Sequence, residues 1–191
     1  MKTLAIVNSA RTKEQGSMML ELLISMVILV IGLGGLMILL VSVMYTNKKS
    51  SRDTTSTMVA EHILEQISSQ PANAVANLTL TDCAGTVWNI STLGAIKGGG
   101  SGVNGGNGAA LTSAGIVDWT QNYGAVPAGY AAQYVACGNG GRQDAYDVRW
   151  NVITMSSYTR MVMVSARPKA SANVGGLQFV MPVNLRTIGG M

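Results

Sequence analysis

The chain has 191 residues, of which 48% are hydrophobic and 12% are charged, and its formal net charge is +4. Soluble domains carry about 25% charged residues, so this composition argues against an ordinary cytosolic enzyme. One histidine excludes a site built from several histidines, and two cysteines exclude a four-cysteine zinc site and a dense disulfide scaffold. A net charge this small does not by itself indicate a nucleic-acid partner.

A long apolar segment follows a polar leader at the N-terminus. Residues 1–16 hold three basic residues and one acid, and residues 22–47 then form a run without any charge. As a helix this run would be about 39 Å long, enough to cross a hydrocarbon core of about 30 Å. The apolar part of a cleaved secretory signal is shorter. We therefore expect one transmembrane helix over residues 17–45.

Glu21 lies at the beginning of the apolar segment. An acid within the membrane costs about 2.5–3.5 kcal/mol on insertion scales, and such a residue usually has a partner. The alternative is a carboxylate at the membrane surface that is solvated by lipid headgroups.

The stretch Gly16-Ser-Met-Met-Leu-Glu21, after a basic leader and before an apolar helix, resembles the class III signal of type IV prepilins and pseudopilins. The resemblance implies that prepilin peptidase removes the leader between Gly16 and Ser17 and then N-methylates Ser17. It also implies that Glu21, the fifth mature residue, pairs with the N-terminal amine of a neighbouring subunit. The first mature residue of the family is usually phenylalanine, and this chain has Ser17 instead.

Three glycines, Gly32, Gly34 and Gly35, lie within the apolar segment. The sequence around them resembles a glycine-containing stretch of the PilV-like minor pilins (type IV pilus modification protein V) and of the I-type pseudopilins of type II secretion. In physical terms each glycine weakens the helix by about 1 kcal/mol relative to alanine. Small residues also let helices approach closely in lipid. Helix flexibility and helix packing both fit the sequence.

The helical pattern continues beyond the membrane segment, over residues 46–70, and Pro71 ends it. We predict one helix of about 50 residues whose second half is amphipathic and packs on a soluble domain. Its basic residues just after the apolar segment are expected to lie at the membrane surface; they are Lys48, Lys49 and Arg52. Its apolar residues at helical spacing are Met58, Val59, Ile63, Leu64 and Ile67.

The remaining chain divides into an irregular region, residues 71–144, and an antiparallel sheet of three or four strands over residues 145–191. The irregular region contains a Gly-rich loop at 94–108 and weak strand patterns at 86–91 and 130–136. With the helix on one face of the sheet, the predicted fold is α+β and pilin-like. Pro182 indicates that the last strand lies at an edge of the sheet.

Polar groups elsewhere give little sign of catalysis. Asp144 and Asp147 lie near Arg142 and Arg149, where a solvated turn is expected rather than a carboxylate pair for acid–base work. We see no residue pattern typical of an enzyme and predict no cofactor and no metal site.

Cys83 and Cys137 both follow the apolar helix. If the domain is exported, the two cysteines face an oxidising compartment, and a single disulfide between them is the simplest outcome. The alternative is a reactive thiol. Neither cysteine has a histidine or another cysteine close to it in the sequence, so this alternative has no local support.

The resemblance implies a minor pilin, a structural subunit that joins or primes a type IV pilus. The expected partners are prepilin peptidase, other pilins, the inner-membrane assembly platform and, before assembly, membrane lipid. The expected location is the bacterial inner membrane, with a periplasmic C-terminal domain, and then the cell-surface pilus. The alternatives are a type II secretion pseudopilin and a pilus-tip adhesin or DNA-uptake subunit, although nucleic-acid binding lacks a cluster of basic residues to support it.

Overall fold

The structure is a computed structural model that describes residues 11–73, 77–96, 105–138, 141, 143–169 and 181–189, with side chains from Met18 onward. The chain divides into two units. The first ends at Lys49, and its described part is the N-terminal portion of the single long helix. The second, Ser50–Met191, contains the rest of that helix and the whole sheet.

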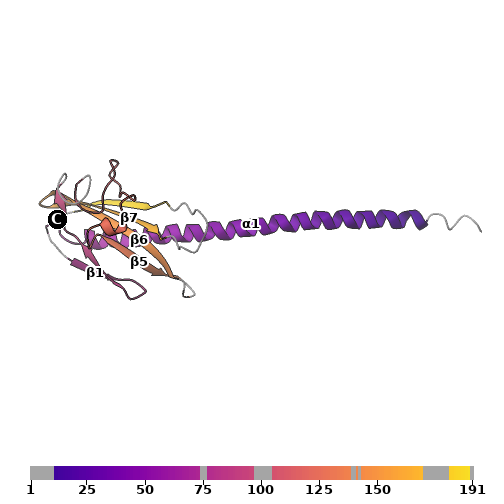
Figure 1. The fold of residues 1–191 in the computed structure, drawn as a ribbon, viewed down its shortest axis with the longest axis horizontal. Coiled ribbons are helices and arrows are strands. Elements are labelled where there is room, and N and C mark those ends of the chain that lie inside the picture. The colour runs from indigo at the N-terminus through magenta and orange to yellow at the C-terminus, as the bar shows by residue number, and fades with distance from the viewer. Residues whose placement is uncertain are drawn as a thin grey trace, which may run out of the picture. The chain divides into compact units, whose positions relative to one another are not determined.

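The helix α1 runs without interruption over Arg11–Ser68 (Figure 1). It begins six residues before the predicted start, within the leader. It ends three residues before Pro71, since proline cannot donate to the preceding turn and clashes with it. The prediction of one long helix is therefore confirmed.

The sheet of the second unit has six strands, and a separate hairpin has two (Figure 1). The order in the main sheet is β3-β6-β7-β8, while β4 and β5 also pair with β6. All of these pairs are antiparallel except the two-residue pair β3–β6. The strands are β1 (Asn77–Thr81), β2 (Val87–Ser91), β3 (Ala95–Ile96), β4 (Asn107–Gly108), β5 (Ala131–Cys137), β6 (Gln143–Ser156), β7 (Thr159–Pro168) and β8 (Val183–Gly189).

The second half of α1 packs on one face of the main sheet. Ala60, Ile63 and Ile67 are fully buried and belong to one core with Val148 and Trp150 of β6. Residues three and four apart lie on one side of a helix, which explains this buried row. Met58 was predicted to share it but is 64% exposed, because it lies two residues before Ala60 and therefore on the opposite side of the helix. The helix-on-sheet fold that the sequence predicts is confirmed.

The opposite face of the sheet is also covered. Asn151 of β6 is fully buried there and donates its side-chain amide to the main-chain carbonyl of Ala109, 2.8 Å away. The segment 105–126 lies over this face, and it includes the 3-10 turn η1 (Tyr123–Ala125). β6 is therefore buried on both faces along most of its length, which explains why its polar residues are as inaccessible as its apolar ones.

The region predicted to be irregular holds more regular structure than expected. The weak patterns at 86–91 and 130–136 correspond to β2 and β5, and β1 has no counterpart in the prediction. The central residues of the Gly-rich loop, 97–104, lie outside the described residues, but its two ends add the short strands β3 and β4 to β6. At the other end of the sheet, β8 follows Pro182 and forms an edge, as predicted.

Candidate functional site

The most distinctive surface is the N-terminal part of α1. Every side chain from Met18 to Ser50 is exposed, and most of them as far as Tyr45 are large and apolar. The helix contains an 18-residue window of mean hydropathy 2.9, and it is long and apolar enough to cross a membrane. An exposed apolar surface of this size marks a site of contact with lipid or protein.

Glu21 is the one acid on this surface. Its main-chain carbonyl accepts a hydrogen bond from the Ser25 hydroxyl at 2.7 Å, while its carboxylate has no partner among the residues that the structure describes. Gly16 and Ser17 lie on the helical backbone just before it, and their side-chain surroundings fall outside the described part. The structure therefore places the predicted cleavage and methylation positions, and Glu21, on one continuous helix.

The three glycines lie on the same exposed segment. A methyl group added at Gly32, Gly34 or Gly35 would meet no atom within 4 Å. Their lack of a side chain is therefore not required by packing among the described residues of this chain. Close contact with another helix and local flexibility both remain consistent with this arrangement.

The basic cluster after the apolar segment is divided between two environments. Lys48 and Lys49 are exposed, as expected for basic residues at a membrane surface. Arg52 instead contacts the sheet, where its Nη2 lies 3.0 Å from Oδ1 of Asp144. This ion pair connects α1 to the beginning of β6, so Asp144 is not part of a free turn.

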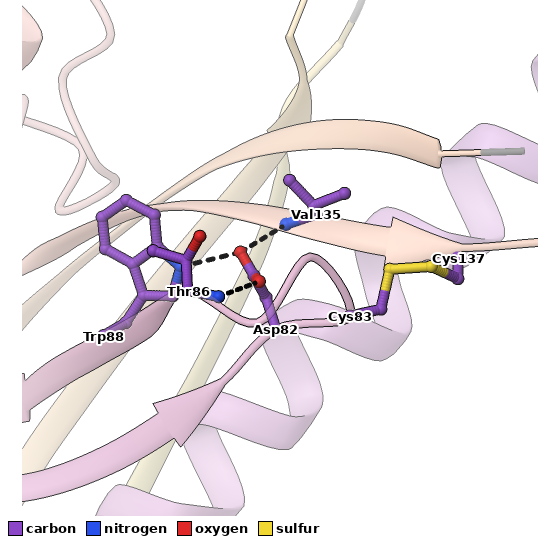
Figure 2. Close-up of a disulfide and its surroundings, with 6 residues drawn as sticks. All are labelled: Asp82, Cys83, Thr86, Trp88, Val135 and Cys137. Carbon is purple, nitrogen blue, oxygen red and sulfur yellow. Dashed lines mark hydrogen bonds between the residues drawn. A yellow bond between two sulfur atoms is a disulfide. The ribbon is translucent and has the colours of Figure 1, made fainter.

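Cys83 and Cys137 form the predicted disulfide (Figure 2). The bond connects the turn of the β1–β2 hairpin with the end of β5, and the two Cα atoms lie 5.9 Å apart. The main-chain N–H of Cys83 also donates to the carbonyl of Val135 at 3.3 Å. An isolated two-stranded hairpin is marginally stable in water, so its attachment to β5 matters for its order.

Asp82 provides a second, noncovalent attachment beside the disulfide. Figure 2 shows its carboxylate between the hairpin and β5: it accepts hydrogen bonds from Thr86 N at 2.8 Å, Trp88 Nε1 at 3.0 Å and Val135 N at 3.4 Å. Burial alone would raise the pKa of Asp82, but these hydrogen bonds favour the charged form and hold the pKa below its ordinary value. The sequence did not single out this residue, because its contact with Val135 joins positions that are 53 residues apart.

The interpretation of Asp147 and Arg149 as part of a solvated turn is wrong. Both lie within β6, and they are only 7% and 2% exposed. Arg149 binds both carboxylate oxygens of Asp147, at 3.1 and 2.9 Å, and donates to the carbonyl of Gln121 at 2.6 Å. Its guanidinium also lies 4.7 Å from the centre of the Trp119 ring. Residues two apart in a strand share a face, and the segment 105–126 covers that face. Arg142 lies outside the described residues.

Trp119 fixes the covering segment to the sheet. Its indole N–H donates to the Ser165 hydroxyl at 3.0 Å, and Arg167 lies over its ring at 4.2 Å. Arg167 is also 3.7 Å from Asp147. A Trp ring that contacts two guanidinium groups is stabilised by cation–π attraction of about 0.5–2 kcal/mol for each. The charged groups of Asp147, Arg149 and Arg167 therefore stabilise the contact between this segment and the sheet.

The described part of the chain was also searched for clusters of metal-ligating side chains. Within the described ranges, no group of three or more His, Cys, Asp or Glu side chains could hold a metal ion. The charged groups that are buried contact one another, aromatic rings or main-chain carbonyls. Comparison of the chain with family models, with curated proteins and with solved structures found no match.

Proposed function

We propose that this chain is a minor pilin, a subunit that prepilin peptidase processes and that then joins or primes a type IV pilus. One observation carries the proposal. The sequence from Gly16 to Glu21 immediately precedes a helical surface that is apolar and exposed from Met18 to Tyr45. The resemblance to prepilins and the free apolar surface are separate observations that favour the same function.

The exposed apolar surface of the helix needs to be buried against lipid or another protein. Each square ångström of apolar surface left in water costs about 25 cal/mol, so a surface of this size does not stay in contact with water. A bilayer can cover it before assembly, and neighbouring apolar helices can cover it in a filament. The small residues Gly32, Gly34 and Gly35, which have open space around them, would permit close contact with such helices.

Glu21 would select the position of the neighbouring subunit. Its carboxylate has no partner in the described part of its own chain, and an unpaired acid in an apolar setting is costly. A positively charged α-amine, created by cleavage before Ser17, is a partner of suitable charge. This pairing would explain why a single acid is retained at the beginning of an otherwise apolar helix.

The C-terminal unit fits an exported domain. The Cys83–Cys137 disulfide is of a kind that persists in oxidising compartments such as the bacterial periplasm. A domain held by a disulfide, in a chain whose described part has one candidate membrane span, supports a periplasmic location and, after assembly, a place on the cell surface.

Processing is the first test. The chain is coexpressed with a prepilin peptidase, and the N-terminus of the product is determined by mass spectrometry. We expect a product that begins at N-methylated Ser17. Gly16→Val should block cleavage, whereas Thr3→Val, which also introduces a valine into the leader, should not. A chain that keeps its leader in the presence of the peptidase, or a cut that does not depend on Gly16, would contradict the proposal.

Assembly is the second test. In the natural host, Glu21→Gln should strongly reduce the amount of this subunit in sheared pili, while Glu61→Gln, an exposed acid farther along α1, should leave it unchanged. Equal incorporation of Glu21→Gln and the wild-type chain would contradict an assembly role for Glu21. Recovery of the chain only with a type II secretion apparatus would favour the pseudopilin alternative.

A further inference from the structure

A groove with a volume of about 660 Å³ lies on the face of the sheet away from α1. Ile153 of β6 and the residues Met161 and Met163 of β7 form its floor. Residues two apart in a strand share a face, so the two methionines lie on the same side of the sheet. Met163 is directly opposite Asn151, whose side-chain amide contacts the segment 105–126 on this face. The groove therefore lies beside the segment that covers the sheet.

A turn of the covering segment forms one wall of the groove. The wall consists of residues 111–115. At its base Leu111 pairs with Val117 in an antiparallel bridge, and both side chains are only 2% exposed. The wall is thus fixed to the hydrophobic core. Ala114, farther along the turn, is exposed and lines the groove.

Arg186 of β8 lies on the other side of the floor. The ladder places it directly opposite Met163, and it is the one charged side chain among the described residues that line the groove. It also lines an adjoining hollow of about 130 Å³, together with Ala114 and Met163. Within the described ranges the Arg186 guanidinium has no hydrogen bond and no ion pair. Its N–H donors can therefore serve a ligand.

The lining indicates which class of ligand fits. It is mostly apolar, and the polar side chains besides Arg186 are the hydroxyls of Thr112, Ser113 and Thr154. Small-molecule sites have volumes of about 300–1,000 Å³ and combine apolar surface with a few polar groups. One guanidinium matches one carboxylate, which its planar fork binds through two hydrogen bonds. A sugar or a nucleotide would need more polar partners for its hydroxyl and phosphate groups.

We propose that this groove binds a small carboxylate with an apolar body. The apolar body lies over Met161 and Met163, and the carboxylate pairs with Arg186. Methionine side chains are flexible and polarizable, so this floor can adapt to apolar groups of different shape. The proposal rests on residues 111–117 and on strands β6, β7 and β8, and it is independent of whether the chain is a pilus subunit.

The test uses the full chain in lipid nanodiscs, with its methionine methyl groups labelled with ¹³C. The probe is 4-phenylbutyrate, which joins one carboxylate to an apolar chain and ring. Three comparison compounds each change one property: 4-phenylbutanol is neutral, 4-phenylbutylamine is cationic, and butyrate lacks the ring. The protein variants are Arg186→Gln and Ala114→Phe, which places a ring in the groove. Their matched controls are Lys169→Gln and Ala84→Phe, at exposed residues outside the groove.

We expect 4-phenylbutyrate to give saturable shifts of the methyl signals of Met161 and Met163, and no saturable shift at Met18 or Met19. The neutral alcohol should bind about threefold more weakly, a modest factor because Arg186 is exposed and water screens its charge. The amine should bind more weakly still, and butyrate should give no measurable shift.

The variants should separate the charge of the groove from its shape. Arg186→Gln should remove the preference for the carboxylate over the alcohol, and Lys169→Gln should keep it. Ala114→Phe should weaken the binding of both compounds, because its ring takes part of the space, whereas Ala84→Phe should leave their binding unchanged.

Three results would overturn the proposal. Equal affinities for 4-phenylbutyrate and 4-phenylbutanol, or a preference that persists in Arg186→Gln, would show that Arg186 does not select an anion. Unchanged binding in Ala114→Phe would place the ligand outside the groove. Shifts that rise without saturation, or that are equally large at Met18 and Met19, would show partition into the lipid instead of binding at the groove.

Discussion

Arg160, buried in β7, donates a hydrogen bond from Nη2 to the main-chain carbonyl of Ile67 in the last turn of α1. The same nitrogen donates to the carbonyl of Gln70 at 2.6 Å. The last four carbonyls of a helix have no partner within the helix, so a side chain from the sheet can satisfy them. Burial lowers the pKa of Arg160, but an arginine remains charged at neutral pH. This contact fixes the end of α1 to the beginning of β7.

Replacing Arg160 should destabilise the C-terminal domain more than replacing the exposed Arg186. Arg160→Met removes the guanidinium donor from the carbonyls of Ile67 and Gln70 and leaves Ile67 with only the Gln70 N–H at 3.2 Å, which we expect to cost about 2 kcal/mol. Arg160→Lys keeps one donor and should lose less. The measurement is urea unfolding of the full chain in detergent micelles, followed by the fluorescence of its three tryptophans, all of which lie in the second unit.

Arg186→Met is the control for this experiment. Arg186 is exposed and bonds to no other described residue, so its replacement should change the free energy of unfolding by less than about 0.5 kcal/mol. Equal losses in Arg160→Met and Arg186→Met would contradict the role that we assign to Arg160.

The disulfide should contribute a large share of the stability of the domain. Cys83 and Cys137 are separated by 54 residues, for which the chain-entropy model gives about 4 kcal/mol. The double variant Cys83→Ser, Cys137→Ser should therefore unfold at a markedly lower urea concentration. Adding a reductant should shift the wild-type transition toward that of the variant and leave the variant unchanged. A wild-type transition that does not respond to full reduction of the bond would contradict this expectation.

Asp82 should make the stability of the hairpin depend on acid pH. The pKa of Asp82 is lower in the folded chain than its unfolded value of about 3.9, because the carboxylate accepts hydrogen bonds from Trp88, Thr86 and Val135. Its contribution is therefore fully present above the unfolded pKa and is lost as the pH falls through the folded pKa.

The corresponding experiment compares Asp82→Asn with the wild-type chain. At pH 7 the variant should be less stable by about 2 kcal/mol, and the difference should shrink as the pH is lowered below 4. Asp53→Asn, on α1, is the control for the loss of a carboxylate elsewhere in the chain. Urea transitions measured between pH 7 and pH 3 give these values, and a constant difference over this range would argue against the carboxylate as the cause.

Gly108 should tolerate substitution less well than Gly115. Both have positive φ, of 118° and 73°, so a side chain at either is strained. A methyl group at Gly108 would also collide with the carbonyl of Trp150 and the ring of Tyr130, whereas Gly115 has open space. We expect a loss of about 1 kcal/mol for Gly115→Ala and about 3 kcal/mol for Gly108→Ala in thermal unfolding. The reverse order would contradict the close approach of β4 to β6.

Several elements could be predicted because their cause is local. The helix α1 could be predicted from three local features. They are the run of apolar residues, the helical spacing of Val59, Ile63 and Ile67, and Pro71, which ends the helix. Strand β7 follows from its β-branched residues and alternation. Pro182, which cannot donate to a ladder, correctly indicated the edge position of the strand after it.

Other features depend on contacts between distant residues. Asp147 and Arg149 look like surface charges in the sequence, and only the segment 105–126 makes them a buried pair. Asp82 and Arg160 gain their importance from Val135 and Ile67, which are 53 and 93 positions away. Strand β1 is short and polar and is ordered by its attachment to β5, so its own pattern did not predict it.

By itself, the sequence determined a long apolar helical segment with Gly16, Ser17 and Glu21 at its beginning, and the two cysteines of one disulfide, because composition and short-range spacing control these features. The tertiary structure decided which charges are buried, how the β1–β2 hairpin is attached to β5, and that β6 is buried on both faces. These features arise where segments far apart in the chain are brought together, so burial and hydrogen bonding at each residue are set by neighbours that local spacing does not specify.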